Sequence, residues 1–140
     1  MQGKRICVMT KEVLYITDFT DSSKEALKWS IWLAKVIKTK LTILYTYRLF
    51  KNAEEVVDMK NRIEKEASKM FVELEAEHLI GKGIVYGFKT EVGFIADRVE
   101  ERTKNNCISY VVMGKGLTLR NKETVCELMD TLQVPFVIIP

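Results

Sequence analysis

The sequence predicts an α/β fold, a single doubly wound domain in which a five-stranded parallel sheet is flanked by about four helices. Short β-branched and aromatic runs alternate along the chain with longer segments whose apolar residues recur at helical spacing. The runs are apolar almost without interruption, which is typical of parallel strands that are buried on both faces. A length of 140 residues suits one domain with an ordinary hydrophobic core.

The predicted strands and helices follow one another in strict alternation. The strands cover residues 12–17, 41–47, 84–88, 109–114 and 135–139, and the helices cover 21–38, 52–80, 90–106 and 121–132. Asp21 or Ser22 is a suitable N-cap for the first helix, and the glycines of "IGKG" are expected to end the second. The residues on the helical period are, helix by helix, Ala26, Leu27, Ser30, Leu33, Ala34 and Ile37, then Val56, Met59, Ile63, Ala67, Met70, Leu74 and Glu77, then Val92, Ile95, Ala96 and Val99.

Ligands of such a fold are expected beyond the carboxyl ends of the strands. Three predicted loops meet there, "TDFTDSS" after the first strand, "TYRLFKN" after the second and "GKGLTLRNK" after the fourth. The glycines of "GKG" allow two interpretations, an anion-binding loop or a turn that needs positive φ. Asp18 likewise either contacts a ligand or accepts hydrogen bonds from its own turn.

Composition excludes several other classes of protein. The net charge is +3 with mixed signs along the chain, so no nucleic-acid partner is expected. No apolar run approaches the roughly 18 residues that span a membrane, so no membrane association and a cytoplasmic location are expected. Three scattered cysteines and one histidine predict reduced, buried thiols and neither a metal site nor a nucleophile–base pair, hence no enzyme. Residues 1–8 are predicted to be an extension before a domain over 9–140.

Two stretches resemble the universal stress protein family. "VLYITDFTDSSKEALKWSIWLAKVIKTKLTILYTY" resembles the first strand, helix and second strand of that family, and "GFKTEVGFIADRVEERTKNNCISYVVMGKG" is similar to its second half. "VPFVIIP" looks like its last strand. The resemblance implies an adenine nucleotide alpha hydrolase-like fold, a stress-response role and a homodimer formed through the strand 136–139. It also implies ATP or AMP as a possible cofactor.

The resemblance places seven residues at nucleotide-binding positions of the family, Ile16, Thr17, Asp18, Thr46, Met113, Gly114 and Gly116. The phosphate-binding half departs from the family pattern, in which a second glycine follows the first by three residues and a Gly-Ser/Thr pair comes later. Leu117 stands at that second glycine position, and Glu123 stands where a hydroxyl should meet phosphate. The loop is roughly five residues shorter than in nucleotide-binding members, and Asn121 is a suitable cap for the helix that follows.

Two functions follow from the resemblance. The first is a dimeric interaction or stress-response module without tight ATP binding. The alternative is an ATP- or AMP-binding protein that uses Asp18 and the loop Gly114–Gly116.

Overall fold

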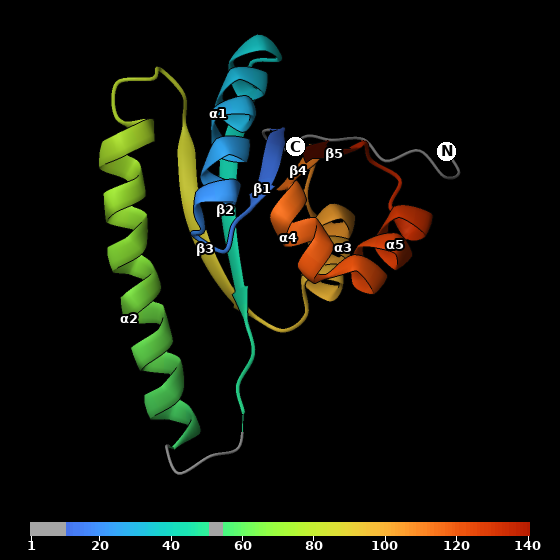
Figure 1. Cartoon of the computed structure of the whole chain (residues 1–140). Coiled ribbons are helices and arrows are strands. Elements are labelled where there is room, and N and C mark those ends of the chain that lie inside the picture. Colours follow the sequence, from blue (N-terminus) through green and yellow to red (C-terminus); the bar gives the residue numbers. More distant parts are fainter. Residues whose placement is uncertain (1–10, 51–54) are drawn as a thin grey trace.

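The computed structural model describes residues 11–50 and 55–140; residues 1–8, predicted to be an extension, lie outside these ranges. Its elements run in the order β1 (Glu12–Ile16), α1 (Asp21–Val36), β2 (Lys40–Tyr47), α2 (Val56–Leu74), the π-helix η1 (Glu75–Leu79), β3 (Tyr86–Val92), α3 (Ile95–Asn105), β4 (Ile108–Gly114), α4 (Lys115–Arg120), α5 (Lys122–Thr131) and β5 (Phe136–Ile139) (Figure 1).

The described strands form one five-stranded sheet in the order β3-β2-β1-β4-β5, and every neighbouring pair is parallel. The chain leaves β1 toward β2 and β3, then crosses to β4 on the other side of β1. The topological switch point therefore lies between β1 and β4, where open α/β sheets bind ligands. The predicted fold class is confirmed.

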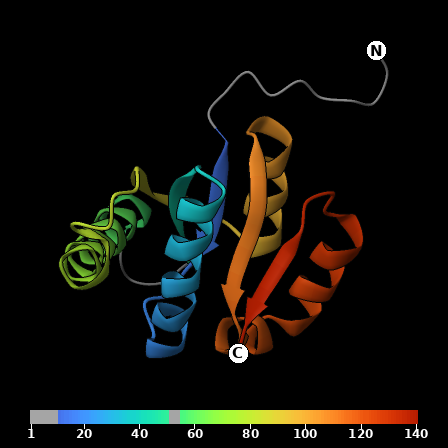
Figure 2. The same ribbon diagram turned by 90° about the horizontal axis from the view of Figure 1, so that it is seen from above.

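Each face of the sheet has its own hydrophobic core because alternate strand residues point to opposite faces. Val13 and Tyr15 of β1 pack with α1, α2 and η1, whereas Leu14 and Ile16 pack with α3, α4 and α5. Figure 2 shows α1 and α2 on one side of the sheet and α3 and α5 on the other. All five residues of β1 are buried, which explains why the strand is apolar without alternation after Glu12.

Helix α2 is held to the sheet edge by aromatic and polar contacts. The ring of Phe71 stacks on that of Phe88 in β3 with 4.5 Å between centroids, and the Tyr86 hydroxyl donates a 2.7 Å hydrogen bond to Glu75. The helix passes into η1 before it ends, and Gly81 and Gly83 then adopt positive φ of 78° and 73°. Glycine serves here as predicted, because other residues adopt this conformation only with strain.

Two sequence predictions about the positions of helices and strands are wrong. Residues 115–120 were assigned to a loop but form α4, so five α-helices are present among the described residues. The segment from residue 90 was assigned to a helix, but it continues β3, and Val92 is 40% exposed. Gly93, with φ of 136°, separates β3 from α3. The mixed polarity of β3, an edge strand with an exposed face, conceals its strand character.

The cysteines also differ from the prediction of buried, reduced thiols. Cys107 is buried but disulfide-bonded, and Cys126 carries a free thiol that is exposed. Cys7 lies outside the described residues. Within residues 11–50 and 55–140, the helices are too short or too polar to cross a membrane.

Candidate functional site

Most of the predicted site residues meet at the carboxyl ends of β1 and β4. Ile16 is the register partner of Met113 across the two strands and of Leu44 in β2. The side chains of Ile16 and Met113 are fully buried in the core beneath α3, α4 and α5. Packing therefore accounts for these two side chains. The hydrogen-bonding groups at this edge of the sheet belong to the polar residues that follow β1.

Thr17 and Asp18 form a tight turn that leads into α1. The buried Thr17 hydroxyl accepts a 2.9 Å hydrogen bond from the Phe19 amide, and Phe19 itself adopts φ of 63°. Asp18 Oδ1 accepts hydrogen bonds from the Thr20 amide at 3.1 Å, the Thr20 hydroxyl at 2.6 Å and the Ser23 hydroxyl at 2.6 Å. Both side chains thus stabilise the start of the helix, as aspartate and threonine commonly do in turns.

The other carboxylate oxygen of Asp18 pairs with an arginine that is distant in the sequence. Arg120, the last residue of α4, donates from Nη2 to Asp18 Oδ2. Partial burial alone would raise the pKa of Asp18, but the hydrogen bonds from Ser23, Thr20 and Arg120 outweigh burial and hold this pKa below its ordinary value of 3.8.

Asp18→Asn is expected to make stability less sensitive to acid. Because the folded-state pKa of Asp18 is lowered, its stabilising contribution is present above the unfolded-state pKa of about 3.9 and is lost as the pH falls through the folded value. Urea unfolding at about pH 7 should show the variant to be less stable than wild type, and the difference should shrink as the pH falls below about 3.9. A difference that stays constant with pH would contradict the assignment.

Gly114 and Gly116 lie against the first turn of α1. A Cβ atom on Gly114 would come within 3.0 Å of the Ser22 carbonyl oxygen, and one on Gly116 within 2.6 Å of the Ser22 hydroxyl oxygen. Neither glycine has positive φ, so the turn interpretation of "GKG" is wrong in that respect. Both glycines allow close approach of α1 to the β4–α4 junction.

The start of α5 differs from a phosphate-binding helix terminus. Asn121 occupies the N-cap position as predicted, but its side chain caps no amide of α5 and instead donates a 2.9 Å hydrogen bond to the Leu117 carbonyl. Glu123 lies in the first turn of α5. A carboxylate there interacts favourably with the positive end of the helix dipole and repels an anion.

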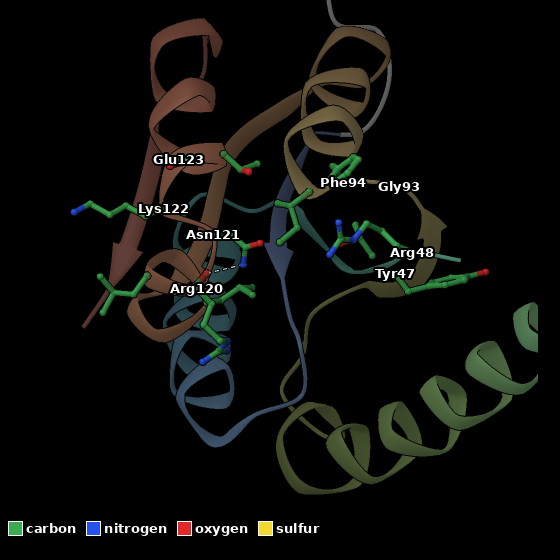
Figure 3. Close-up of a pocket in the computed structure, with 13 residues that line it drawn as sticks. Tyr47, Arg48, Gly93, Phe94, Arg120, Asn121, Lys122 and Glu123 are labelled. Atoms are coloured by element: carbon green, nitrogen blue, oxygen red, sulfur yellow. Dashed lines mark hydrogen bonds between the residues drawn. The ribbon is translucent and has the colours of Figure 1, made fainter. Parts of the chain in front are cut away.

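A cavity of about 590 Å³ opens between the end of β2, the β3–α3 junction and the α4–α5 junction (Figure 3). It is lined by Thr46, Tyr47, Arg48, Gly93, Phe94, Ile95, Leu117, Leu119, Arg120, Asn121, Lys122, Glu123 and Thr124. Figure 3 shows Arg48 and Phe94 on one wall and Asn121 and Glu123 on the other. The Arg48 guanidinium stacks 4.8 Å from the centroid of the Phe94 ring.

Of the seven predicted site residues, only Thr46 lines this cavity. Sequence reasoning missed Arg48 and Phe94. Arg48 lies in the loop after the second strand, one of the three loops expected at the ligand-binding edge. Its place in the sequence therefore could have indicated that it lies near a ligand site. Phe94 was assigned to a helix, and no local pattern indicates that it lies beside the cavity. Arg120 belongs to the loop "GKGLTLRNK", where the sequence already offered cationic side chains to an anion, and it lines the cavity. Within the described parts of the chain, no group of three metal-ligating side chains gathers.

Comparison with known proteins agrees with this architecture. The profile of the "Universal stress protein family" matches residues 9–117, which ends before α5 and β5. No curated protein sequence matches the chain.

Solved structures of this family have the same fold. A family protein from Burkholderia pseudomallei has a TM-score of 0.75 at 18% identity, over 95% of this chain and 98% of that one. A universal stress protein in complex with cAMP has a TM-score of 0.64 at 19% identity, over 94% and 97%. One from Archaeoglobus fulgidus in complex with dAMP has a TM-score of 0.61 at 12% identity, over 95% and 99%. From the match over residues 9–117, the chain belongs to the universal stress protein family.

Proposed function

We propose that this protein is a dimeric, cytoplasmic stress-response or interaction module of the universal stress protein family that acts without tight ATP binding and without catalysis. The observation that carries the proposal is the structure of the connection from β4 to α5. This connection consists of the short helix α4 rather than an open glycine-rich loop. Phosphate-binding loops depend on backbone amides that converge on an open concavity.

The side chains of this connection support the same function. Gly116 packs toward Ser22 on α1 and does not line the cavity, so it offers no close approach to a ligand there. Glu123 does line the cavity from the first turn of α5. A triphosphate at this end of the cavity would meet a carboxylate of the same sign, which opposes binding.

A second candidate function is the binding of an adenine nucleotide, either AMP or the larger ATP. The cavity volume of about 590 Å³ lies within the usual range of small-molecule sites. Three cationic side chains, Arg48, Arg120 and Lys122, are among the residues that line it. Structural relatives in complex with cAMP and dAMP favour this candidate.

Titration calorimetry with ATP, ADP and AMP in the presence of Mg²⁺ separates the two functions. We expect no saturable ATP binding with a Kd below about 10 µM. A ligand at one hundred times its Kd stabilises a folded protein by about 2.7 kcal/mol, and we expect no such thermal stabilisation by ATP. Tighter binding would overturn the first function in favour of the second. Glu123→Gln should strengthen any residual ATP binding because it removes the repulsive charge, whereas Glu127→Gln, in α5 but outside the cavity lining, should not.

The proposed dimer is formed through β5, which is the last strand of the sheet and has one open edge. An apolar hollow of about 160 Å³ lies beside it, lined by Trp29, Trp32, Leu33, Tyr110, Val112, Val137 and Ile139. Trp29 and Trp32 are 52% and 56% exposed. Exposed aromatic surface next to an unpaired strand edge is typical of a protein interface.

Ile138→Lys is expected to convert the dimer to a monomer, because a lysine on an edge strand opposes strand pairing between chains. Ile138 is 36% exposed, so the substitution leaves the core intact. Leu119→Lys is the control, since Leu119 is 60% exposed on α4 and does not line the hollow. Analytical ultracentrifugation measures both variants. A wild-type monomer, or a dimer that survives Ile138→Lys, would contradict this interface.

A further inference from the structure

The two oxygens of the Asp18 carboxylate have different hydrogen-bond partners. Four donors reach the carboxylate, the Thr20 amide, the Thr20 hydroxyl, the Ser23 hydroxyl and Arg120 Nη2. Three of these donors share Oδ1, so the turn and the first turn of α1 satisfy that oxygen, whereas Arg120 is the donor that reaches Oδ2. A sugar hydroxyl or a base amine that approached Oδ2 would compete with Arg120 for this oxygen.

Arg120 is the donor that differs from the others. Thr20 is the N-cap of α1 and Ser23 lies in its first turn, so both remain beside Asp18 as long as α1 is folded. Arg120 approaches from α4, 102 positions further along the chain, and its side chain is 51% exposed. Its contact with Asp18 therefore depends only on tertiary packing and on the conformation of one long side chain.

Arg120 contacts Asp18 and also lines the cavity. Asp18 itself is not among the residues that line the cavity. Figure 3 shows the Arg120 side chain extending from α4 toward the start of α1. An added Cβ atom on Gly116 would lie 3.4 Å from Arg120 Nη1, so the guanidinium also packs against the β4–α4 junction.

We propose that Arg120 is a specificity-determining residue that excludes nucleosides from this edge of the sheet by occupying the Asp18 carboxylate. An acidic side chain after a strand of an open α/β sheet is a common acceptor for ribose hydroxyls. Here the guanidinium makes that hydrogen bond in place of the sugar and neutralises the carboxylate. This inference rests on the proposed function, in which ATP is not bound tightly. It names the Arg120 side chain as one cause of that weak binding.

The test measures adenosine binding by calorimetry to the full chain and its variants. Adenosine has no charge, so removing a cation from the protein does not change its affinity through attraction to phosphate. Arg120→Ala is expected to bind adenosine at least tenfold more tightly than wild type, because it frees one oxygen of Asp18. Arg120→Lys, which keeps a cationic donor, should stay within threefold of wild type.

Lys115→Ala is the matched control, because it removes one positive charge from the same short helix outside the cavity lining. Its adenosine affinity should equal that of wild type. Adding Asp18→Asn to Arg120→Ala should abolish the gain. Circular dichroism establishes that each variant is folded. A gain below tenfold in folded Arg120→Ala, an equal gain in Lys115→Ala, or a gain that persists with Asp18→Asn would overturn the proposal.

The two proposals fail separately. Tight ATP binding by the wild-type chain overturns the proposed function, whereas the role of Arg120 depends on the ratio of adenosine affinities between variant and wild type.

Discussion

Replacing Met113 with alanine is expected to lower the free energy of unfolding by about 2–5 kcal/mol, the usual cost of truncating a buried methionine. Met113 is fully buried and packs in the core between the sheet and helices α3, α4 and α5. Truncation leaves a cavity that the neighbouring strand residues fill only partly, because β4 is paired on both sides, with β1 and with β5. Urea denaturation of wild type and variant measures the difference.

Met129→Ala is the matched control for this prediction. Met129 lies in α5 and is 52% exposed, so the same truncation should change the free energy of unfolding by no more than about 0.5 kcal/mol. If Met113→Ala is as mild as Met129→Ala, the core beneath α4 and α5 is not packed as the structure shows. If Met113→Ala alone is destabilising, packing explains this position without any ligand.

Gly114→Val is the second substitution with a large expected effect, a loss of about 1–3 kcal/mol through overpacking. Gly114 has φ of −75° and ψ of 151°, a conformation open to every residue, so backbone strain plays no part. The obstacle is space, since the new Cβ atom would meet the Ser22 carbonyl oxygen at 3.0 Å and Ser23 Cα at 3.5 Å. These are backbone atoms of α1, which moves only as a whole helix.

Gly87→Val separates this steric effect from the general effect of replacing a glycine in a strand. Gly87 lies in β3, has ordinary φ, and has no atom within 4 Å of an added Cβ. Valine there should be neutral or stabilising, because β-branched residues suit strands better than glycine does. Thermal unfolding compares the variants. A Gly114→Val protein as stable as Gly87→Val would show that α1 does not approach β4 closely.

The class of fold followed from the sequence because its evidence is local. Runs such as 41–47 and 109–114 are mostly apolar, aromatic or β-branched, and that pattern is typical of strands buried on both faces. The helical period of residues 21–38 identified α1 and its buried side chains Ala26, Leu27 and Ala34. Prediction failed at β3 and α4, where an edge strand carries polar residues and a six-residue helix is too short to show a period.

The candidate site was predictable only in part. The carboxyl ends of β1 and β4 were expected to meet, and they do, because parallel strands on either side of a switch point must end at one edge. The sequence indicated that Asp18 follows β1, and it left open whether the carboxylate serves a ligand or its own turn. It also showed Glu123 at the first turn of a helix and a short connection after Gly114.

The sequence by itself determined the α/β class, the family resemblance and the departure from the family's phosphate-binding pattern, because each rests on residue types at fixed spacing along the chain. Only the tertiary structure decided that Arg120 pairs with Asp18, that Gly114 and Gly116 face Ser22, and that Arg48 and Phe94 form a wall of the cavity. The Asp18–Arg120 contact joins residues 102 positions apart. Its existence depends on how α4 packs against α1, and no local propensity encodes that packing.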